Sequence, residues 1–276
     1  MSTQEFSSTD KLNVLSMDVE KGQYTLWQTF GIWLAAGVPM WLLGWLVYPA
    51  MSVGLASADA ALLRVRLLTA GLIWQFVLSM IILYREEGNF RLRTISRRFW
   101  LNHPINAKTG TTKKSLWWWL VLLIPLTAVL EIALRPTFVK LWSIAFPFLV
   151  DPKKYDGAAL FSPELRSHWV GSWALFGLFF VFGLFNTVLG EEFIFRGVLL
   201  PKMQGLFGKW DWLANGVIFG FYHLHQPWGI LNSVLTGWIF AFSAKHFRSS
   251  WFAIILHSGE TVLLLVLILG VVLGLA

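Results

Sequence analysis

Long apolar runs separated by short polar segments make up most of the chain. Seven runs occur, at about residues 26–50, 65–84, 116–134, 170–190, 211–224, 228–244 and 251–276. A helix needs about 20 residues to cross the hydrocarbon core of a bilayer, and several of these runs reach that length alone. The run at 211–224 is shorter, so we expect its helix to include flanking residues. The pattern predicts an all-α, polytopic membrane helix bundle with about seven transmembrane helices, within a range of six to eight.

Composition supports the membrane class. Of the 276 residues, 56% are hydrophobic and only 13% are charged, whereas ordinary soluble domains carry about 25% charged residues. This excludes a soluble globular enzyme and a disordered chain. The runs are continuously apolar rather than alternating, which argues against a β-barrel. The chain has no cysteine, which excludes disulfides, thiolate metal sites and cysteine catalysis.

The net charge of +7 raises the question of nucleic-acid binding. The basic residues lie between apolar runs, as in cytoplasmic loops, so we expect the lipid bilayer as a partner and no nucleic acid. Segment 85–114 holds eight Lys/Arg and two Glu. The positive-inside rule places this segment, and with it the N-terminus, in the cytoplasm and the C-terminus outside. We expect an integral membrane protein of a bacterial plasma membrane.

The predicted domain organisation is simple. Residues 1–25 are polar and lack the basic start and short apolar core of a secretory signal, so they are interpreted as a cytosolic tail. Residues 26–276 form a single transmembrane domain. Residues 136–168 are interpreted as an external connection between helices.

Charged groups inside the apolar second half of the chain are costly and therefore indicate function or pairing. The first group is Glu191, Glu192 and Arg196. On a helix, Glu192 and Arg196 are four residues apart and share a face, whereas Glu191 is rotated about 100° away. One acid would then be neutralised while its neighbour stays available for chemistry. The alternative is a single ion-pair network of both acids around Arg196.

Two further polar groups contain histidine. The segment Phe219 to His225 holds His223 and His225, which lie on roughly opposite faces of a helix, so only one of them can easily face a common centre. His257 lies four residues before Thr261, a spacing that allows a shared face. A lone intramembrane histidine is more often a hydrogen-bonded structural residue, and Thr261 is as well explained by a bond to the carbonyl four residues earlier.

The three groups together resemble the CPBP family of CAAX proteases and bacteriocin-processing proteins, also called Abi-type, which includes the type II CAAX prenyl endopeptidases. Its pattern is Glu-Glu-x-x-x-Arg, then Phe-x-x-x-His, then His-x-x-x-Asn on separate membrane helices. The matching residues are Glu191, Glu192 and Arg196, then Phe219 and His223, then His257. Phe221 and His225 have the same spacing as the second pair, and Thr261 stands where Asn is usual. The resemblance covers roughly residues 170–270, which would be the catalytic core.

The resemblance implies an intramembrane endopeptidase. Glu191 would be the general base, and His223 would help to hold the attacking water. His257, with the hydroxyl of Thr261 as a second donor, would polarise the scissile carbonyl. Glu192 and Arg196 would orient the helix and the peptide. The substrate would be a peptide or protein in or at the membrane.

A metal is the open question about cofactors. Glu191, His223 and His257 could supply the carboxylate and two imidazoles that catalytic zinc prefers. His-Glu-x-x-His is absent from the sequence, and we favour the metal-free glutamate mechanism.

Two other function classes compete with the protease. Intramembrane Glu and His residues also mark proton relays, so a proton-coupled transporter is the first alternative. A non-catalytic membrane scaffold or immunity protein is the second. Substitution of Glu191 would discriminate among the three.

Overall fold

The computed structural model describes residues 22–106, 109–149 and 160–275. Most of the predicted polar tail, residues 1–21, lies outside the described residues. The described residues form helices, and their β-type pairing is limited to isolated bridges between Ile105 and Thr112 and between Gly205 and Gly208. The all-α prediction is confirmed.

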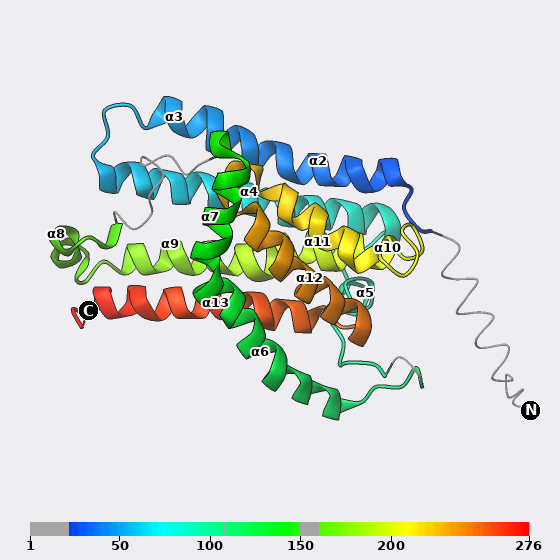
Figure 1. Ribbon diagram of the computed structural model, residues 1–276. Helices are drawn as coiled ribbons and strands as arrows, with labels where there is room; N and C mark the ends of the chain where they lie inside the picture. Colours follow the sequence, from blue (N-terminus) through cyan, green and yellow to red (C-terminus); the bar gives the residue numbers. More distant parts are fainter. Residues whose placement is uncertain (1–21, 107–108, 150–159, 276) are drawn as a thin grey trace, which may run out of the picture.

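All seven apolar runs are helical (Figure 1). The α-helices are α2 (Leu26–Leu42), α3 (Tyr48–Met51), α4 (Ser57–Glu87), α5 (Leu92–Arg98), α6 (Leu120–Ala128), α7 (Arg135–Ala145), α8 (Pro163–Arg166), α9 (Trp173–Leu184), α10 (Leu200–Lys202), α11 (Asp211–Tyr222), α12 (Ile230–Phe247) and α13 (Ser250–Val272). Four wider π-helical segments interrupt them, namely η1 (Leu43–Val47), η3 (Val129–Leu134), η8 (Phe185–Gly190) and η9 (Phe193–Leu199). Short 3₁₀ segments include η2 (Lys114–Trp119), η10 (His223–His225) and η11 (Pro227–Gly229).

Among the described residues, fewer helices are long enough to span a membrane than there are apolar runs. Within the described part of the chain, five helical stretches are long and apolar enough to span a membrane: Leu26–Met51, Ser57–Glu87, Lys114–Ala145, Trp173–Lys202 and Ser250–Val272. The predicted count of seven is therefore not confirmed. The helix α11 has only 12 residues, and α12 carries polar Asn232, Ser233 and Thr236 in its first half.

One connection is more ordered than the sequence suggested. Residues 136–168 were expected to be an external loop, but α7 continues the third span as far as Ala145. Pro136 does not end this span: it lies in the first turn of α7, directly after the wider turns of η3. In Figure 1 the span of α6 and α7 runs obliquely across the other helices.

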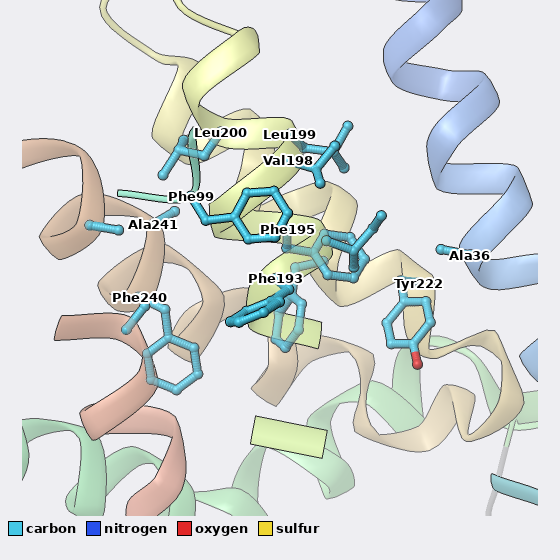
Figure 2. Packing of buried hydrophobic residues seen from close by; sticks show 14 of the residues in the cluster. Ala36, Phe99, Phe193, Phe195, Val198, Leu199, Leu200, Tyr222, Phe240 and Ala241 are labelled. Atoms are coloured by element: carbon cyan, nitrogen blue, oxygen red, sulfur yellow. The ribbon is translucent and has the colours of Figure 1, made fainter. Parts of the chain in front are cut away.

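The main apolar core surrounds η9. Phe195, Val198 and Leu199 are fully buried there, and the same cluster includes Ala36 of α2 and Phe240 of α12. Figure 2 shows these side chains around η9, together with Phe99 and Tyr222. The segment that follows the two adjacent acids is thus held by protein on several sides.

The helices α11 and α12 pack unusually closely because they meet at glycines. A Cβ atom on Gly220 would lie 2.2 Å from Cγ2 and 2.9 Å from the backbone nitrogen of Val234. A Cβ atom on Gly216 would lie 2.3 Å from the ring of Trp238. Small residues let membrane helices approach in this way. The contact fixes the helix that carries Phe219 and His223 against α12.

Arg98 ties the basic segment to the bundle. Its buried guanidinium donates to Glu86 at 2.6 Å and to the backbone carbonyl of Gly197 at 2.8 Å. A second donation reaches the Val198 carbonyl at 3.3 Å. The Tyr24 hydroxyl donates to Glu86, and burial raises the pKa of Tyr24, so this donor stays protonated at neutral pH. The C-terminal part of η9 is thereby fixed by α5.

Candidate active site

Glu191 and Glu192 lie at the junction of the two π-helical segments η8 and η9. Their side chains are 2% and 0% exposed, so both carboxylates are enclosed by protein. A Cβ atom on the preceding Gly190 would lie 2.4 Å from the Phe185 carbonyl oxygen and 2.9 Å from that of Leu72. Only glycine permits this approach of the span to α4. Wider π-turns occur often at functional sites, where they redirect side chains.

Glu192 joins two spans through one oxygen. Its Oε1 accepts from Nη1 of Arg196 at 3.0 Å and lies 2.9 Å from Nδ1 of His257. The pairing with Arg196 follows the predicted spacing of four residues. Nη2 of Arg196 also donates to the Gly237 carbonyl of α12 at 3.3 Å. One buried ion pair therefore links the Trp173–Lys202 span to α12 and α13.

Aromatic rings complete the surroundings of Arg196. Its guanidinium carbon lies 4.1 Å from the centre of the Phe219 ring and 5.4 Å from that of Phe240. Cation–π contacts of this kind are stronger when the cation is desolvated, and Arg196 is fully buried. Phe219 is 2% exposed, whereas Phe221 is 43% exposed, so Phe219 is the phenylalanine of this segment that faces the charged cluster.

Glu191 faces both histidines of the predicted site. Its Oε1 lies 3.9 Å from Nε2 of His223, and its Oε2 lies 3.8 Å from Nε2 of His257. These distances exceed a direct hydrogen bond. Nδ1 of His223 lies 2.9 Å from the Phe219 carbonyl oxygen, so His223 has a neutral partner and His257 has the carboxylate of Glu192. The two rings thus have different electrostatic environments.

Two residues outside the predicted site, Tyr222 and Gln75, form a hydrogen-bonded chain to the Glu191 carboxylate. The Tyr222 hydroxyl interacts with its carboxylate, and Nε2 of Gln75 on α4 donates to that hydroxyl at 2.5 Å. His225 stacks on His223 but is not part of the cavity lining that includes His223, and it packs closely on η1, where a Cβ atom on Gly44 would lie 3.2 Å from the Cβ atom of His225. The available sequence signal for Gln75 was a polar amide inside the apolar run 65–84. Nothing in the spacing connected it to the acids.

A single cavity of about 260 Å³ brings the predicted residues together. Its lining includes Glu191, His223, His257 and Thr261. The methyl group of Thr261 fills the notch at Gly183, where a Cβ atom would lie 2.3 Å from it. Glu192 and Arg196 lie behind this lining, in contact with His257 and Phe219.

The cavity lining also contains two acids and a base outside the predicted set of site residues. Glu131 lines the cavity and accepts from Nδ2 of Asn232 at 3.0 Å. Arg135 and Glu260, which also line it, form an ion pair at 2.7 Å. The signal for Glu131 was a lone carboxylate in the apolar run 116–134.

The fit of a metal ion can be tested on the donor atoms. Among the residues that the structure describes, no group of three or more His, Cys, Asp or Glu side chains is arranged to hold a metal ion. The three candidate ligands Glu191, His223 and His257 face one another without forming such a group. We therefore derive no step through a metal.

Comparison with known families gives one match. Residues 171–263 match the family model described as Type II CAAX prenyl endopeptidase Rce1-like. The matched segment holds Glu191, His223 and His257, and it leaves out Glu131 and Arg135. Comparisons with curated proteins and with solved structures gave no significant match.

Proposed function

We propose that this chain, whose residues 171–263 match the Rce1-like family model of type II CAAX prenyl endopeptidases, hydrolyses peptide bonds of membrane-associated substrates with a water molecule activated by Glu191. The observation that supports this mechanism is the position of the Glu191 carboxylate, 3.9 and 3.8 Å from the two histidine Nε2 atoms in one cavity. A water molecule can bridge atoms at this separation.

In the proposed first step, Glu191 takes a proton from water while the water oxygen bonds to the scissile carbonyl carbon. Nδ1 of His223 donates to the Phe219 carbonyl oxygen, because a carbonyl can only accept, and this tautomer leaves Nε2 as an acceptor. That nitrogen accepts the second proton of the water in a hydrogen bond and orients the oxygen for attack. A positioned base of this kind contributes about 10²–10⁴-fold to rate.

The developing oxyanion needs a donor. A carboxylate beside an imidazole stabilises the cationic ring, and Glu192 lies 2.9 Å from Nδ1 of His257. We assign the Nε2–H group of the charged His257 as the donor to the oxyanion, with the hydroxyl of Thr261 as a second donor. Arg196 has a positioning role, because it fixes the Glu192 carboxylate from the other side.

The test of this function uses the purified full chain in lipid vesicles. The probe is a quenched-fluorescence peptide that ends in a farnesylated CAAX sequence, alongside its unprenylated twin. Glu191→Gln should lower kcat/KM at least about 100-fold, because an amide cannot accept the water proton. Glu260→Gln is the matched control, an acid of the same cavity outside the proposed machinery, and should stay within a few-fold of wild type.

Three outcomes would contradict the proposal or its details. Wild-type cleavage by Glu191→Gln would remove this residue from catalysis. No cleavage by the wild type, with proton-linked flux that depends on Glu191, would favour the transporter. No cleavage and no flux, with biological function unchanged by Glu191→Gln, would favour the scaffold.

A chelator experiment separates the metal-free mechanism from a zinc mechanism. We expect cleavage to persist after incubation with a strong chelator and removal of the complex. Loss of cleavage that zinc alone restores would overturn the metal-free proposal.

A further inference from the structure

Glu131 is an intramembrane acid of the catalytic cavity that lies outside the matched segment. It belongs to the Lys114–Ala145 span and lies in the π-helical segment η3. Glu191 and Glu192 likewise lie beside π-helical turns, on the Trp173–Lys202 span. Ionisable residues at membrane depth are costly to keep and indicate function. Both the depth and the local helix geometry therefore single out Glu131.

The carboxylate of Glu131 is held by neutral partners. Nδ2 of Asn232 donates to its Oε2 at 3.0 Å, and the Thr236 hydroxyl, one turn further along α12, also interacts with it. The nearby cation Arg135 pairs with Glu260 instead, at 2.7 Å. A carboxyl group without an ion-pair partner is free to change its protonation state during a reaction.

Asn232 can serve both protonation states. Its Nδ2 donates to a carboxylate, and its Oδ1 can accept from a carboxylic acid. That Oδ1 is buried and has no hydrogen-bond partner among the described residues. The Asn232 amide can therefore stabilise both the ionised and the protonated carboxyl group of Glu131. An arginine at this position would stabilise the ionised form much more strongly.

His257 connects the two acids of the cavity. Its Nε2 lies 3.8 Å from Glu191, and its ring is within electrostatic range of Glu131. Glu131 also lines a second, mainly apolar cavity of about 320 Å³ between the third span and α13. The two cavities share Glu131, Phe240, His257 and Glu260, so Glu131 borders both the apolar cavity and the cavity that holds the reacting groups.

We propose that Glu131 is a second catalytic acid, which protonates the leaving nitrogen of the scissile peptide bond. This inference rests on the proposed function. Glu191 removes a proton from water as the new C–O bond forms. As the C–N bond breaks, its electron pair goes to the nitrogen, which takes a proton from Glu131. Glu131 then recovers the proton held by Glu191 through water, so the net reaction is the addition of one water molecule.

Leaving-group chemistry tests this role. An amide nitrogen must be protonated before it can leave, whereas an ester oxygen leaves much more readily without a proton. The probe is the farnesylated peptide and a matched depsipeptide in which an ester replaces the scissile amide. Glu131→Gln should lower kcat/KM for the amide about 100-fold and for the ester less than about fivefold, because only the amide requires the acid. Glu191→Gln should impair both substrates.

Controls separate catalysis from structure. Ser233→Ala, a change at another polar residue of the cavity lining, should leave the amide-to-ester ratio unchanged. Melting temperature, followed by the fluorescence of the 17 tryptophans, verifies folding of each variant. Equal loss on amide and ester in a folded Glu131→Gln protein would overturn the proposal, and so would unchanged amide cleavage. If the wild type cleaves neither substrate, the proposed function itself fails, which is a different result.

Discussion

At the scale of single residues, the site depends on a charge pair that has no access to water. Arg196 and Glu192 are both 0% exposed and pair at 3.0 Å. Breaking a buried ion pair by removing one partner costs about 3–5 kcal/mol, because the other charge is left uncompensated. Here the remaining charge would also disturb His257, which shares the same carboxylate oxygen.

Arg196→Met should therefore destabilise the fold by about 3 kcal/mol and abolish cleavage. The double variant Arg196→Met, Glu192→Gln removes both charges and should recover most of the stability while activity stays lost, since Nδ1 of His257 no longer has the Glu192 carboxylate beside it. Denaturant unfolding in mild detergent and peptide cleavage measure the two effects. Equal stability of the single and double variants would contradict this account.

Residue spacing predicted the contact between Glu192 and Arg196 because both lie on one helical face. It could not predict that Glu192 also contacts His257, a residue 65 positions away, because that contact depends on how two spans pack. For the same reason Glu131, Tyr222 and Gln75 were missed. The functional roles of Glu191, His223 and His257 stay predictions, and so does the contribution of Thr261.

At the scale of elements, the glycine contact between α11 and α12 sets the position of His223. His223 directly follows α11, and Gly220 lies three residues earlier. The contact of Gly220 with the Val234 backbone nitrogen leaves no space for a methyl group. A change there has to move the helix, because the backbone of α12 cannot rotate away as a side chain can.

Gly220→Ala should cost about 1–3 kcal/mol of stability, the usual range for overpacking, and should lower cleavage by displacing His223. Gly177→Ala is the matched control. It also lies inside a helix, but a Cβ there meets no atom within 4 Å, so we expect a neutral effect or stabilisation of up to about 1 kcal/mol. Thermal unfolding of the two variants checks the difference. Equal destabilisation would show that the close approach is not responsible.

The position and length of the continuous apolar runs were sufficient to locate the seven helical regions. It did not predict the π-helical turns, because an extra residue in a turn leaves the hydrophobicity of the run unchanged. It also missed α7, where Arg135 and Lys140 lower the hydrophobicity of a helix that continues the span. The expectation that the helix at 211–224 includes flanking residues was wrong, because α11 comprises only Asp211–Tyr222.

At the scale of the whole molecule, the basic segments gather at one end of the bundle. In Figure 1 the end of α4, the helix α5, the start of α6 and the turn between α12 and α13 lie at the same end. Arg97, Arg98, Lys245 and Arg248 belong to these parts of the chain. The positive-inside rule predicts that this end is cytoplasmic, in agreement with the predicted orientation of the N-terminus.

Cysteine labelling tests the orientation, because the chain has no native cysteine. Thr111→Cys and Ser167→Cys change exposed residues before the third span and before the fourth span, respectively. In intact bacterial cells that express the protein, a membrane-impermeant maleimide should label Ser167→Cys. It should label Thr111→Cys only after permeabilisation. The reverse pattern would invert the proposed orientation.

Composition predicted the membrane class of the molecule because it sums over all residues. The number of crossings and the shape of the cavity depend on how individual helices tilt and end. A bacterial source and the domain boundaries at residues 25 and 170–270 stay predictions.

The cavity is completed by residues from outside the segment that matches the family model. The wall that carries Glu131 and Arg135, and the Gln75 side chain behind Tyr222, come from spans that precede the recognisable segment 171–263. That segment transplanted into another scaffold would carry the acids and imidazoles but leave them open to acyl chains on two sides. The unit able to turn over substrate is therefore larger than the unit that sequence comparison can detect.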